Sequence, residues 1–441
     1  MNLRIPETSK KRVVIIGGGF GGMNVALKLK NSPYQVVLID KQNYHTFQPL
    51  LYQVATGGLD ATSIAYPLRK LLRKIPNAFY RMTEVLNIDT QNKFVQTEIG
   101  NLKYDILVIA TGSTTNFFNL PEDSTVQMKS LKSIPEALEI RSYITENFEQ
   151  VLLEKEPESI QSYINIAIVG GGPTGVELAG AIGEMKNRML PRDYPEIDFS
   201  KMTVHLFEAT GHVLGPMSEV SQQRALKYLE KFGVQVHLNT AVESYENHVL
   251  TLADGKKLDT KTVIWTAGVK GAPITGLPQD TYLRNGRILV NRFNEVQGLK
   301  DVYAIGDIAC MVTDKIKRGH PMVAPVAIQQ GELLAQNLIR LEEGLPIKEF
   351  EYFDKGSMAT VGRDKAVVDF PGKKVSLGGF IAWIAWMFVH LMSLVGFRNK
   401  LIVFTGWLYN YINYDRVLRL VFFPSRHQVQ LKERVKEKEI V

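Results

Sequence analysis

Two runs of four apolar residues, each followed by a turn rich in glycine, lie 153 positions apart in the chain. Val13–Ile16 leads into Gly17–Gly22, and Ile166–Val169 leads into Gly170–Gly175. A short apolar run that ends in glycines is typical of a buried strand in a parallel sheet, and the residues after the glycines have the composition of a helix. The pattern predicts two strand–turn–helix units of the same plan.

A second pair of segments repeats at a similar distance from each glycine turn. Ile106–Gly112 follows the first turn, and Val263–Gly268 follows the second. Each pairs an apolar run with a small-residue turn, which predicts another strand of each sheet. After the second unit, Ile288–Val290 and Val302–Asp307 are strand-like and would complete the first sheet, so the second unit is expected to be inserted in the first.

The glycine turns have the G-x-G-x-x-G spacing of a dinucleotide-binding fingerprint, in the strand-to-helix context that its mechanism requires. Gly17 would form the tight turn, Gly19 would admit a pyrophosphate close to the backbone, and Gly22 would let helix and strand pack closely. The free N–H groups at the start of the helix would hold the negative charge. The same roles are predicted for Gly170, Gly172 and Gly175.

The second strand of each unit ends in an acidic residue, Asp40 in the first unit and Glu208 in the second. Such a carboxylate accepts hydrogen bonds from ribose hydroxyls and repels a 2′-phosphate, which favours NADH over NADPH in the second unit. The alternative interpretation is a solvated acid at a strand end. Two such units in one chain indicate one tightly held and one exchanging redox dinucleotide, for which flavin and nicotinamide are the obvious pair.

The predicted fold class is α/β, with two Rossmann-like dinucleotide-binding domains, the second inserted in the first, and a C-terminal helical region. The expected domains are an FAD-binding domain in two parts at 1–121 and 278–345, an NADH-binding domain at 122–277, and a C-terminal domain at 346–441 with membrane-anchoring helices at about 380–425.

The chain of 441 residues contains one cysteine, Cys310. A single cysteine excludes a disulfide framework and any intramolecular redox dithiol, and therefore excludes disulfide reductases and enzymes that need two positioned thiols. We expect Cys310 to be a small buried hydrophobic residue. The eight histidines form no ligand-like cluster in the sequence, so no metal site is predicted.

The net charge of +7 is concentrated at the C-terminal end, where Arg398–Val441 carries nine Lys and Arg against four Asp and Glu. The remaining body is nearly neutral, which argues against nucleic-acid binding. The N-terminus, Met1–Lys10, has no apolar segment of an export signal, so the body is expected on the cytoplasmic side.

The C-terminal region is strongly apolar after two strand-like pieces, Ser357–Val361 and Ala366–Phe370. Ile381–Phe397 is slightly shorter than the roughly 20 residues of a membrane span. Three interpretations stay open: a hairpin that docks on one membrane face, an ordinary dimer or domain core, and a true span. Docking is favoured by aromatic residues typical of a membrane interface, which are Trp383, Trp386, Trp407, Tyr409, Tyr411 and Tyr414. It is also favoured by an apolar helical face formed by Leu401, Phe404, Leu408, Tyr411 and Ile412. The basic residues that could meet anionic headgroups are Arg416, Arg419 and Arg426. His390 is expected to be satisfied within its own helix.

The fingerprints, Ala110-Thr111-Gly112 and Tyr303–Asp307 resemble those of flavoproteins with two dinucleotide-binding domains. Phe47–Tyr52, Ala324–Gly331 and the apolar tail narrow the resemblance to the type II NADH dehydrogenases, which are NADH:quinone oxidoreductases that pump no protons. The resemblance covers essentially the whole chain.

This resemblance implies a set of site residues. Gly17, Gly19, Gly22 and Asp40 would hold FAD, with Asp307 on the ribityl chain and Pro49 and Leu50 near the isoalloxazine; Gly170, Gly172, Gly175 and Glu208 would hold NADH. Glu177 and Gln329 are the catalytic candidates, and Ala110, Thr111, Gly112, Gly268, Gly306 and Ala324 complete the cofactor-binding set. Asp307 could also be a simple helix N-cap, and Glu177 an acid that suits the dipole in a first helical turn.

One position departs from the family's quinone motif, Ala-Gln-x-Ala-x-Gln. Pro325 stands where the first Gln is usual, and Gln329 fills the second. Proline suits the first turn of a helix but cannot donate a hydrogen bond to a quinone.

The expected activity is transfer of a hydride from NADH to tightly bound FAD and of electrons to membrane quinone, either ubiquinone or menaquinone. We expect a peripheral homodimer on the cytoplasmic face of the cell membrane. The alternatives are a soluble NADH-dependent flavin reductase or diaphorase, and a redox-sensing flavoprotein that binds NADH.

Overall fold

The computed structural model describes residues 3–314, 316–373, 375–413 and 419–421 of the chain. The chain divides into two compact units, each made of three segments. The first unit comprises Met1–Thr46, Ala65–Thr114 and Val269–Asp354, and the second comprises Phe47–Ile64, Thr115–Gly268 and Lys355–Val441.

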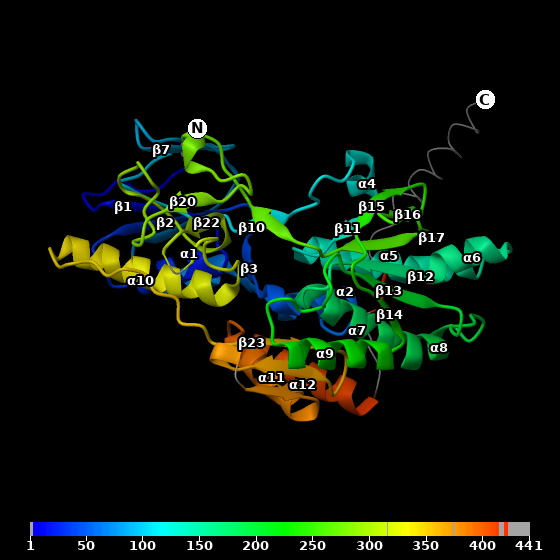
Figure 1. Cartoon of the computed structure of the whole chain (residues 1–441). Helices are drawn as coiled ribbons and strands as arrows, with labels where there is room; N and C mark the ends of the chain where they lie inside the picture. Colours follow the sequence, from blue (N-terminus) through cyan, green and yellow to red (C-terminus); the bar gives the residue numbers. More distant parts are fainter. Residues whose placement is uncertain (1–2, 315, 374, 414–418, 422–441) are drawn as a thin grey trace. The chain divides into compact units, whose positions relative to one another are not determined.

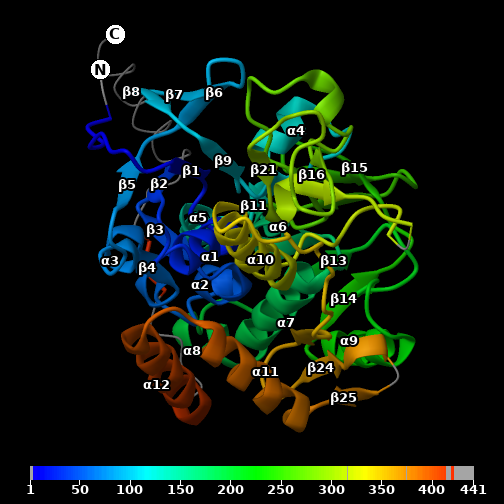
Figure 2. The same ribbon diagram turned by 90° about the vertical axis from the view of Figure 1, so that its left-hand side faces the viewer.

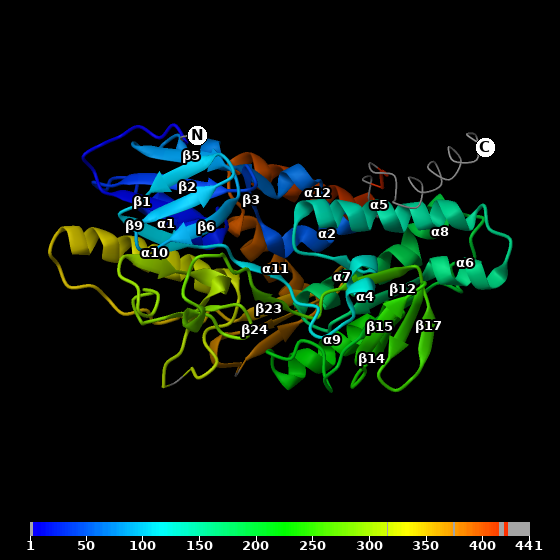
Figure 3. The same ribbon diagram turned by 90° about the horizontal axis from the view of Figure 1, so that it is seen from above.

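The first unit is built on a five-stranded parallel sheet with the order β21-β9-β1-β2-β5. Strands β9, β1, β2 and β5 are labelled in Figure 3. Val13 of β1 pairs with Val36 of β2 on one side and with Ile106 of β9 on the other. Every residue of β1 and β9 is buried, as expected of central strands covered on both faces. The strands are β1 Arg12–Ile16, β2 Gln35–Asp40, β5 Ala78–Met82, β9 Ile106–Ile109 and β21 Val302–Ala304.

Helices α1 (Phe20–Lys28) and α10 (Ala324–Glu342) lie side by side in the first unit (Figure 2). They approach closely through two glycines, because a Cβ atom at Gly331 would come within 2.6 Å of the Gly21 carbonyl oxygen. This packing joins the last long helix of the unit to the helix that follows the first glycine turn. The short helix α3 spans Leu68–Leu72.

The other strands of the first unit form small sheets. The prediction that Ile288–Val290 would complete the first sheet is wrong: this strand, β20, pairs in parallel with β22 instead. The place beside β9 is taken by β21, which confirms the prediction for Val302–Asp307. The small-sheet strands are β3 Tyr44–Thr46, β4 Ala65–Pro67, β6 Val85–Asp89, β7 Phe94–Thr97, β8 Gly100–Lys103, β20 Ile288–Val290 and β22 Ala309–Met311. Strands β10 (Ser113–Thr115) and β19 (Val269–Gly271) occupy the segments at which the chain passes from one unit to the other.

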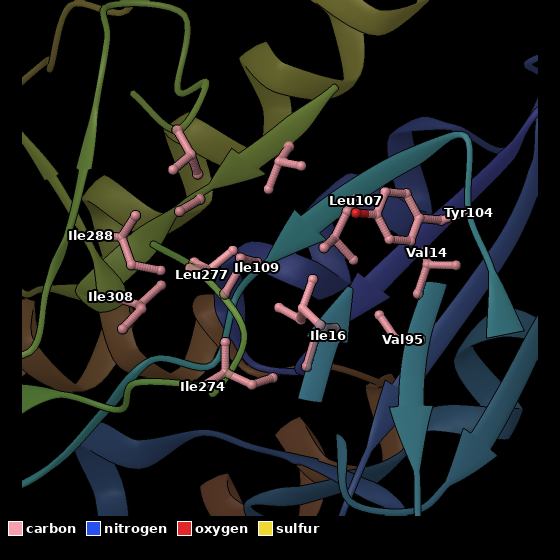
Figure 4. Packing of buried hydrophobic residues seen from close by; sticks show 14 of the residues in the cluster. Val14, Ile16, Val95, Tyr104, Leu107, Ile109, Ile274, Leu277, Ile288 and Ile308 are labelled. Atoms are coloured by element: carbon pink, nitrogen blue, oxygen red, sulfur yellow. The ribbon is translucent and has the colours of Figure 1, made fainter. Parts of the chain in front are cut away.

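A cluster of buried hydrophobic side chains forms the core of the first unit (Figure 4). Ile16 and Ile109 come from the central strands, and Ile274, Leu277 and Ile288 come from the segment that follows the second glycine fingerprint in the chain. Burial of these side chains is the main force that holds the late segment on the early strands.

The second unit repeats the plan with the parallel sheet β11-β18-β12-β13-β14. Strands β11, β12, β13 and β14 are labelled in Figure 1. The order β18-β12-β13-β14 matches β9-β1-β2-β5, and the antiparallel strands β15, β16 and β17 precede β18 as β6, β7 and β8 precede β9. The internal repeat predicted from the glycine turns is therefore confirmed. The strands are β11 Lys129–Ser130, β12 Asn165–Val169, β13 Thr203–Phe207, β14 Val234–His237, β15 Val242–Glu246, β16 Val249–Leu252, β17 Lys257–Asp259 and β18 Thr262–Trp265.

Helix α7 is the counterpart of α1, because it follows the second fingerprint. The helices of this unit before the C-terminal region are α2 Leu51–Ala55, α4 Glu122–Gln127, α5 Ile134–Val151, α6 Pro157–Ile164, α7 Pro173–Arg188, α8 Leu190–Asp193 and α9 Glu219–Lys231.

The C-terminal region of the second unit is an antiparallel sheet followed by two helices. The two strands predicted from the sequence are confirmed as β23 (Ser357–Thr360) and β24 (Ala366–Asp369). A third strand, β25 (Ser376–Gly378), was not predicted, since it is only three residues long. Helices α11 (Phe380–Ser393) and α12 (Phe397–Asn413) cover most of the apolar stretch.

Across the described ranges, none of the helices combines the length and apolarity that crossing a bilayer requires. Tyr414, Arg416 and Arg426, which we named with the apolar region, lie outside the described residues.

Candidate functional site

The first glycine turn joins β1 to α1 and requires glycine at two positions. Gly17 has φ +105°, and a Cβ atom there would lie 2.2 Å from the Ala110 carbonyl oxygen. A Cβ atom at Gly22 would lie 1.9 Å from the Gly17 carbonyl oxygen. The turn is held in place by a 2.8 Å hydrogen bond from the Gly17 N–H to the Ile39 carbonyl. No larger residue fits at either position without moving the backbone.

Gly19 of the same turn faces open space. A Cβ atom there would have no neighbour within 4 Å, and Gly19 precedes the first residue of α1 without a side-chain cap. Glycine has no side chain that could cap the first helical turn, so the backbone of the turn itself faces this space. An open backbone at a helix N-terminus is the arrangement that accepts a pyrophosphate.

Asp40, at the end of β2, bonds directly to this turn. Its Oδ2 accepts a 2.5 Å hydrogen bond from the Gly18 N–H, and its Oδ1 accepts one of 2.7 Å from the Gln42 N–H. Burial raises the pKa of Asp40, while the two N–H groups oppose that rise. A carboxylate accepts more than one hydrogen bond on each oxygen, so Asp40 can bond the turn and a ribose hydroxyl together.

Asp307 lies in the short 3₁₀ turn Gly306–Ile308 after β21, and the N-cap residue of this turn is Ile305. Oδ2 of Asp307 accepts a 2.5 Å hydrogen bond from the Ser113 hydroxyl. The preceding Gly306 donates its N–H to Oε1 of Gln330 on α10, at 2.7 Å. Side-chain hydrogen bonds thereby join the end of β21 to Ser113, which follows the Ala110–Gly112 turn, and to α10.

The predicted quinone-motif residues lie in the first two turns of α10. The helix begins at Ala324 with Pro325 in its first turn, as we predicted. The Gln329 side chain bonds the backbone of Phe353 twice: Nε2 donates to its carbonyl and Oε1 accepts from its N–H, both at 3.0 Å. Gln329 therefore retains one N–H for a further partner.

Pro49 and Leu50 lie in a 3₁₀ turn, Gln48–Leu50, that belongs to the second unit. Leu50 is fully buried and Pro49 is partly exposed. The residues that we predicted for FAD are thus divided between the two units.

The second glycine turn reproduces the first almost contact for contact. Gly170 has φ +108°, and its Cβ would lie 2.4 Å from Cα of Ala267; a Cβ at Gly175 would lie 1.9 Å from the Gly170 carbonyl oxygen. The Gly170 N–H donates to the Phe207 carbonyl at 2.8 Å. Gly172, like Gly19, would meet nothing within 4 Å. Both turns are therefore cradles that leave the middle glycine open.

Glu208 is the counterpart of Asp40. Its Oε2 accepts a 2.6 Å hydrogen bond from the Gly171 N–H, and its Oε1 accepts from both the N–H and the hydroxyl of Thr210 at 2.8 Å. The carboxylate is thus oriented by the turn that it faces. Its place at the end of β13, beside the cradle, suits a ribose hydroxyl and opposes a second phosphate.

The turns after β9 and β18 differ in one respect. Thr111 donates its hydroxyl to the Ala272 carbonyl at 2.8 Å, and the adjoining Gly112, with φ +73°, faces open space. A Cβ atom at Gly268 would instead meet the ring of Phe118, at 3.1 Å from Cζ.

Glu177 is a buried acid on α7, and its predicted place in the first helical turn is wrong. Because Pro173 begins the helix, Glu177 is the fifth residue and lies beyond the first turn. Its Oε1 accepts a 3.4 Å hydrogen bond from the Thr360 N–H. Burial raises the pKa of Glu177 to about 8, although the Thr360 N–H and the Trp386 indole lower it. The carboxyl group is therefore mostly protonated at neutral pH.

A cavity of about 110 Å³ lies close to Glu177 within the second unit, and Thr360 and Trp386 line it. Its other walls come from α2, α7, α11 and α12, with Tyr52, Trp383, Trp407 and Tyr411 among the aromatic side chains. The sequence analysis missed Thr360 and the cavity, since Thr360 is 183 residues from Glu177 and carries no motif. The cluster of tryptophans in the tail was the one available signal.

Two single residues behave as predicted. Cys310 is buried at 1% exposure, and His390 Nδ1 bonds the Trp386 carbonyl one turn earlier in α11 at 2.8 Å.

Comparison with known proteins places these features in one family. Residues 11–331 match the family model "Pyridine nucleotide-disulphide oxidoreductase", and residues 355–413 match "NDH2 C-terminal domain". Type II NADH:quinone oxidoreductase Ndh of Mycobacterium tuberculosis is 35% identical over 92% of this chain and 89% of its own. The chain belongs to the type II NADH:quinone oxidoreductases.

Similarity also extends to proteins of lower sequence identity. The type II NADH:quinone oxidoreductase of Staphylococcus aureus is 29% identical over 83% of this chain and 91% of its own. Among solved structures, NDH2 of Plasmodium falciparum in complex with NADH superposes with a TM-score of 0.85 at 22% identity, covering 92% of this chain and 99% of the other. The sulfide:quinone oxidoreductase of Aquifex aeolicus follows at a TM-score of 0.70 and 20% identity, covering 92% and 96%. At these identities the structures show a shared fold.

Proposed function

We propose that this type II NADH:quinone oxidoreductase oxidises NADH, uses FAD as its resident cofactor and reduces a membrane quinone without moving protons across the membrane. The observation that carries the proposal is the presence of two cradles of the same build in one chain that also matches the NDH2 C-terminal domain. The single cysteine supports it, because a disulfide-reducing relative would need a second thiol.

FAD is assigned to the first cradle, where the open Gly19 and the carboxylate of Asp40 suit a pyrophosphate and a ribose. When bound, FAD supplies the chemistry that accepts electrons as a pair from NADH and delivers them to quinone. Asp307 is assigned to the ribityl chain, and Pro49 and Leu50 to the isoalloxazine. The remaining residues assigned to the flavin site are Gly17, Gly22, Ala110, Thr111, Gly112, Gly306 and Ala324.

NADH is assigned to the second cradle, with the pyrophosphate at Gly170, Gly172 and Gly175 and the adenosine ribose at Glu208. The Glu208 carboxylate selects against NADPH, because it would lie close to the 2′-phosphate and two negative charges repel each other. Gly268 completes this site after β18.

Glu177 is proposed to hold a proton near the reacting groups. Its Oε1 accepts from the Thr360 N–H, which leaves Oε2 to carry the proton that burial favours. A neutral carboxyl group also avoids a buried negative charge beside substrates that receive electrons. Gln329 is proposed to donate its remaining N–H to a quinone carbonyl, a hydrogen bond that Pro325 cannot donate.

The membrane contact is proposed to be the apolar surface of α11 and α12. Side chains on both helices are between one third and four fifths exposed, which a protein in water alone would not favour over so many positions. They belong to residues that a monotopic helix pair would insert into the lipid interface; the residues are Phe380, Ile381, Ile384, Phe388, Val389 and Met392 on α11, and Phe397, Leu401, Phe404, Leu408, Tyr409, Tyr411 and Ile412 on α12.

We further propose a peripheral homodimer on the cytoplasmic face of the cell membrane, where NADH is available. The domain limits predicted from the sequence, at 121, 277 and 345, remain part of the proposal. Mass measurement in detergent tests the dimer.

The decisive experiment is purification from membranes, followed by a flavin spectrum and NADH-driven reduction of ubiquinone and menaquinone analogues side by side. We expect a bound flavin and steady quinone turnover, and the faster analogue identifies the quinone. A protein that cannot be reconstituted with FAD, or that is reduced once without quinone turnover, would contradict the proposal.

A further inference from the structure

We infer that Phe118 contacts the nicotinamide ring of the nucleotide and orients it in the second cradle. This inference rests on the proposed assignment of NADH to that cradle. Phe118 follows the connection from the first unit and lies before α4, and it belongs to no fingerprint or motif of the sequence.

The backbone of Phe118 adopts a conformation that a bulky side chain rarely takes. Its φ is +53°, in the left-handed region, where glycine and asparagine are usual. Residues held in this region persist only where their surroundings determine the conformation, and they cluster at ligand-binding sites. The side chain is nevertheless 63% exposed, so burial in a core does not account for the conformation.

Asn116 and Trp265 hold the loop in this conformation. The Phe118 N–H donates to Oδ1 of Asn116 at 2.9 Å, and the Asn116 N–H donates to the Gly268 carbonyl at 3.0 Å. The Trp265 indole donates to the Asn116 carbonyl at 2.8 Å, and its ring lies 6.4 Å from that of Phe118 at 60°. These contacts fix an exposed aromatic ring in one place.

The ring lies at the nucleotide-binding edge of the sheet. It covers Gly268, and the neighbouring Ala267 packs against Gly170, the first glycine of the cradle. In the strand order β18-β12-β13, the cradle follows the central β12, and Glu208 follows β13 on one side. A dinucleotide whose ribose lies at Glu208 and whose pyrophosphate lies at the cradle extends its other half to the β18 side, where Phe118 lies.

The repeat of the fold supplies an internal comparison. Gly112 holds the place of Gly268 in the first unit, and the space beside it is open. The aromatic cover is therefore a feature of the second cradle and is not a requirement of the fold. An aromatic ring beside a nicotinamide ring offers apolar contact and favourable edge or face geometry.

The test compares three substitutions in the full-length flavin-loaded enzyme. Phe118→Asn removes the ring, and asparagine readily adopts the left-handed backbone. Phe118→Ala removes the ring, and alanine disfavours that backbone. Phe118→Tyr keeps the ring. Phe370→Ala, at another exposed phenylalanine of the second unit, is the matched control. The measurements are the dissociation constants of NAD⁺ and of adenosine 5′-diphosphoribose, which lacks nicotinamide, together with the KM for NADH.

We expect the Asn and Ala variants to raise the dissociation constant of NAD⁺ and the KM for NADH about 3- to 10-fold, while binding of adenosine 5′-diphosphoribose stays unchanged. The Tyr variant and the control should behave as wild type. Unchanged NAD⁺ binding in both ring-free variants would overturn the inference, and so would an equal loss for both nucleotides, which would assign the ring to the fold of the cradle. A wild-type enzyme that binds neither nucleotide would overturn the proposed NADH site itself.

Discussion

Oε1 of Glu177 on α7 accepts a hydrogen bond from the backbone N–H of Thr360, at the last position of β23. The two residues are 183 positions apart in the chain, and both are buried. The contact joins the helix of the second glycine cradle to the sheet of the C-terminal region. The acid that we propose to hold a proton therefore contacts the region that matches the NDH2 C-terminal domain.

Glu177 should make the stability of the enzyme depend on pH. The pKa is 4.5 in the unfolded chain and about 8 in the fold, so between these values the folded state keeps a proton that the unfolded chain releases. The free energy of unfolding therefore falls as pH rises through this window, by on the order of a few kcal/mol, and levels off above it. Glu177→Gln, which mimics the protonated acid, should remove this contribution.

The measurement is the melting temperature of both proteins from pH 5 to pH 9. The melting temperature of the variant should increase relative to that of the wild type as pH rises. Its quinone turnover should be slower, and the pH dependence of that turnover should change. Melting curves that stay parallel over the whole range would contradict the raised pKa, and wild-type kinetics would contradict the proton-holding role.

Two glycines of the second cradle, to which we assign NADH, should respond differently to the same substitution. Gly170→Ala should destabilise the protein by more than about 1 kcal/mol, because its φ is +108° and its Cβ would lie 2.4 Å from Cα of Ala267. Gly172→Ala should leave the melting temperature unchanged, because the site is open, yet raise the KM for NADH roughly 10- to 100-fold by blocking close approach of the pyrophosphate.

Gly17→Ala and Gly19→Ala form the matching pair in the first cradle, with flavin content as the readout in place of KM. Loss of stability in Gly172→Ala, or unimpaired NADH binding, would show that the open face does not receive the nucleotide.

Glu208 should set the preference for NADH. Glu208→Gln keeps an oxygen acceptor for the Gly171 N–H but removes the charge, so the KM for NADH should rise roughly tenfold and that for NADPH should fall. Steady-state kinetics with both nucleotides measure the change. Glu219→Gln, at an exposed acid in the first turn of α9, is the control that alters net charge alone. An unchanged ratio of the two specificity constants would remove Glu208 from the ribose site.

Charges on the apolar surface of α11 and α12 should weaken membrane binding. The double variant Phe388→Glu and Leu408→Glu changes two side chains that are 64% and 49% exposed, so the fold should be retained. Loss of two buried apolar contacts with lipid should lower the partition onto vesicles of phosphatidylethanolamine and phosphatidylglycerol by at least about tenfold. Co-sedimentation measures it.

Leu153→Glu, at a 73% exposed leucine after α5, is the matched control and should bind vesicles as wild type does. If the double variant sediments with vesicles as fully as the control, the membrane contact lies elsewhere.

Local sequence pattern predicted much of the fold. The apolar runs before the glycines, the acids at Asp40 and Glu208 and the positions of Gly17 and Gly170 each follow from short-range steric and hydrogen-bonding needs, and all of them lie in the predicted elements. Prediction was weaker where strands are short. The predicted sheet for Ile288–Val290 was wrong, because three apolar residues can pair with any open sheet edge. Only the packing of the whole unit selects one edge.

The sequence by itself determined the duplicated plan, the glycine cradles and the absence of a dithiol, since these depend on residue identity and on spacings of a few positions. The tertiary structure decided the surroundings of Glu177, the bonds of Gln329 to Phe353 and the ring of Phe118 above Gly268. Each of these joins residues 24 to 183 positions apart. A shifted pKa depends on which distant groups exclude water around the acid, and the position of an exposed ring depends on which distant groups hold its loop. Long-range packing alone brings those groups together.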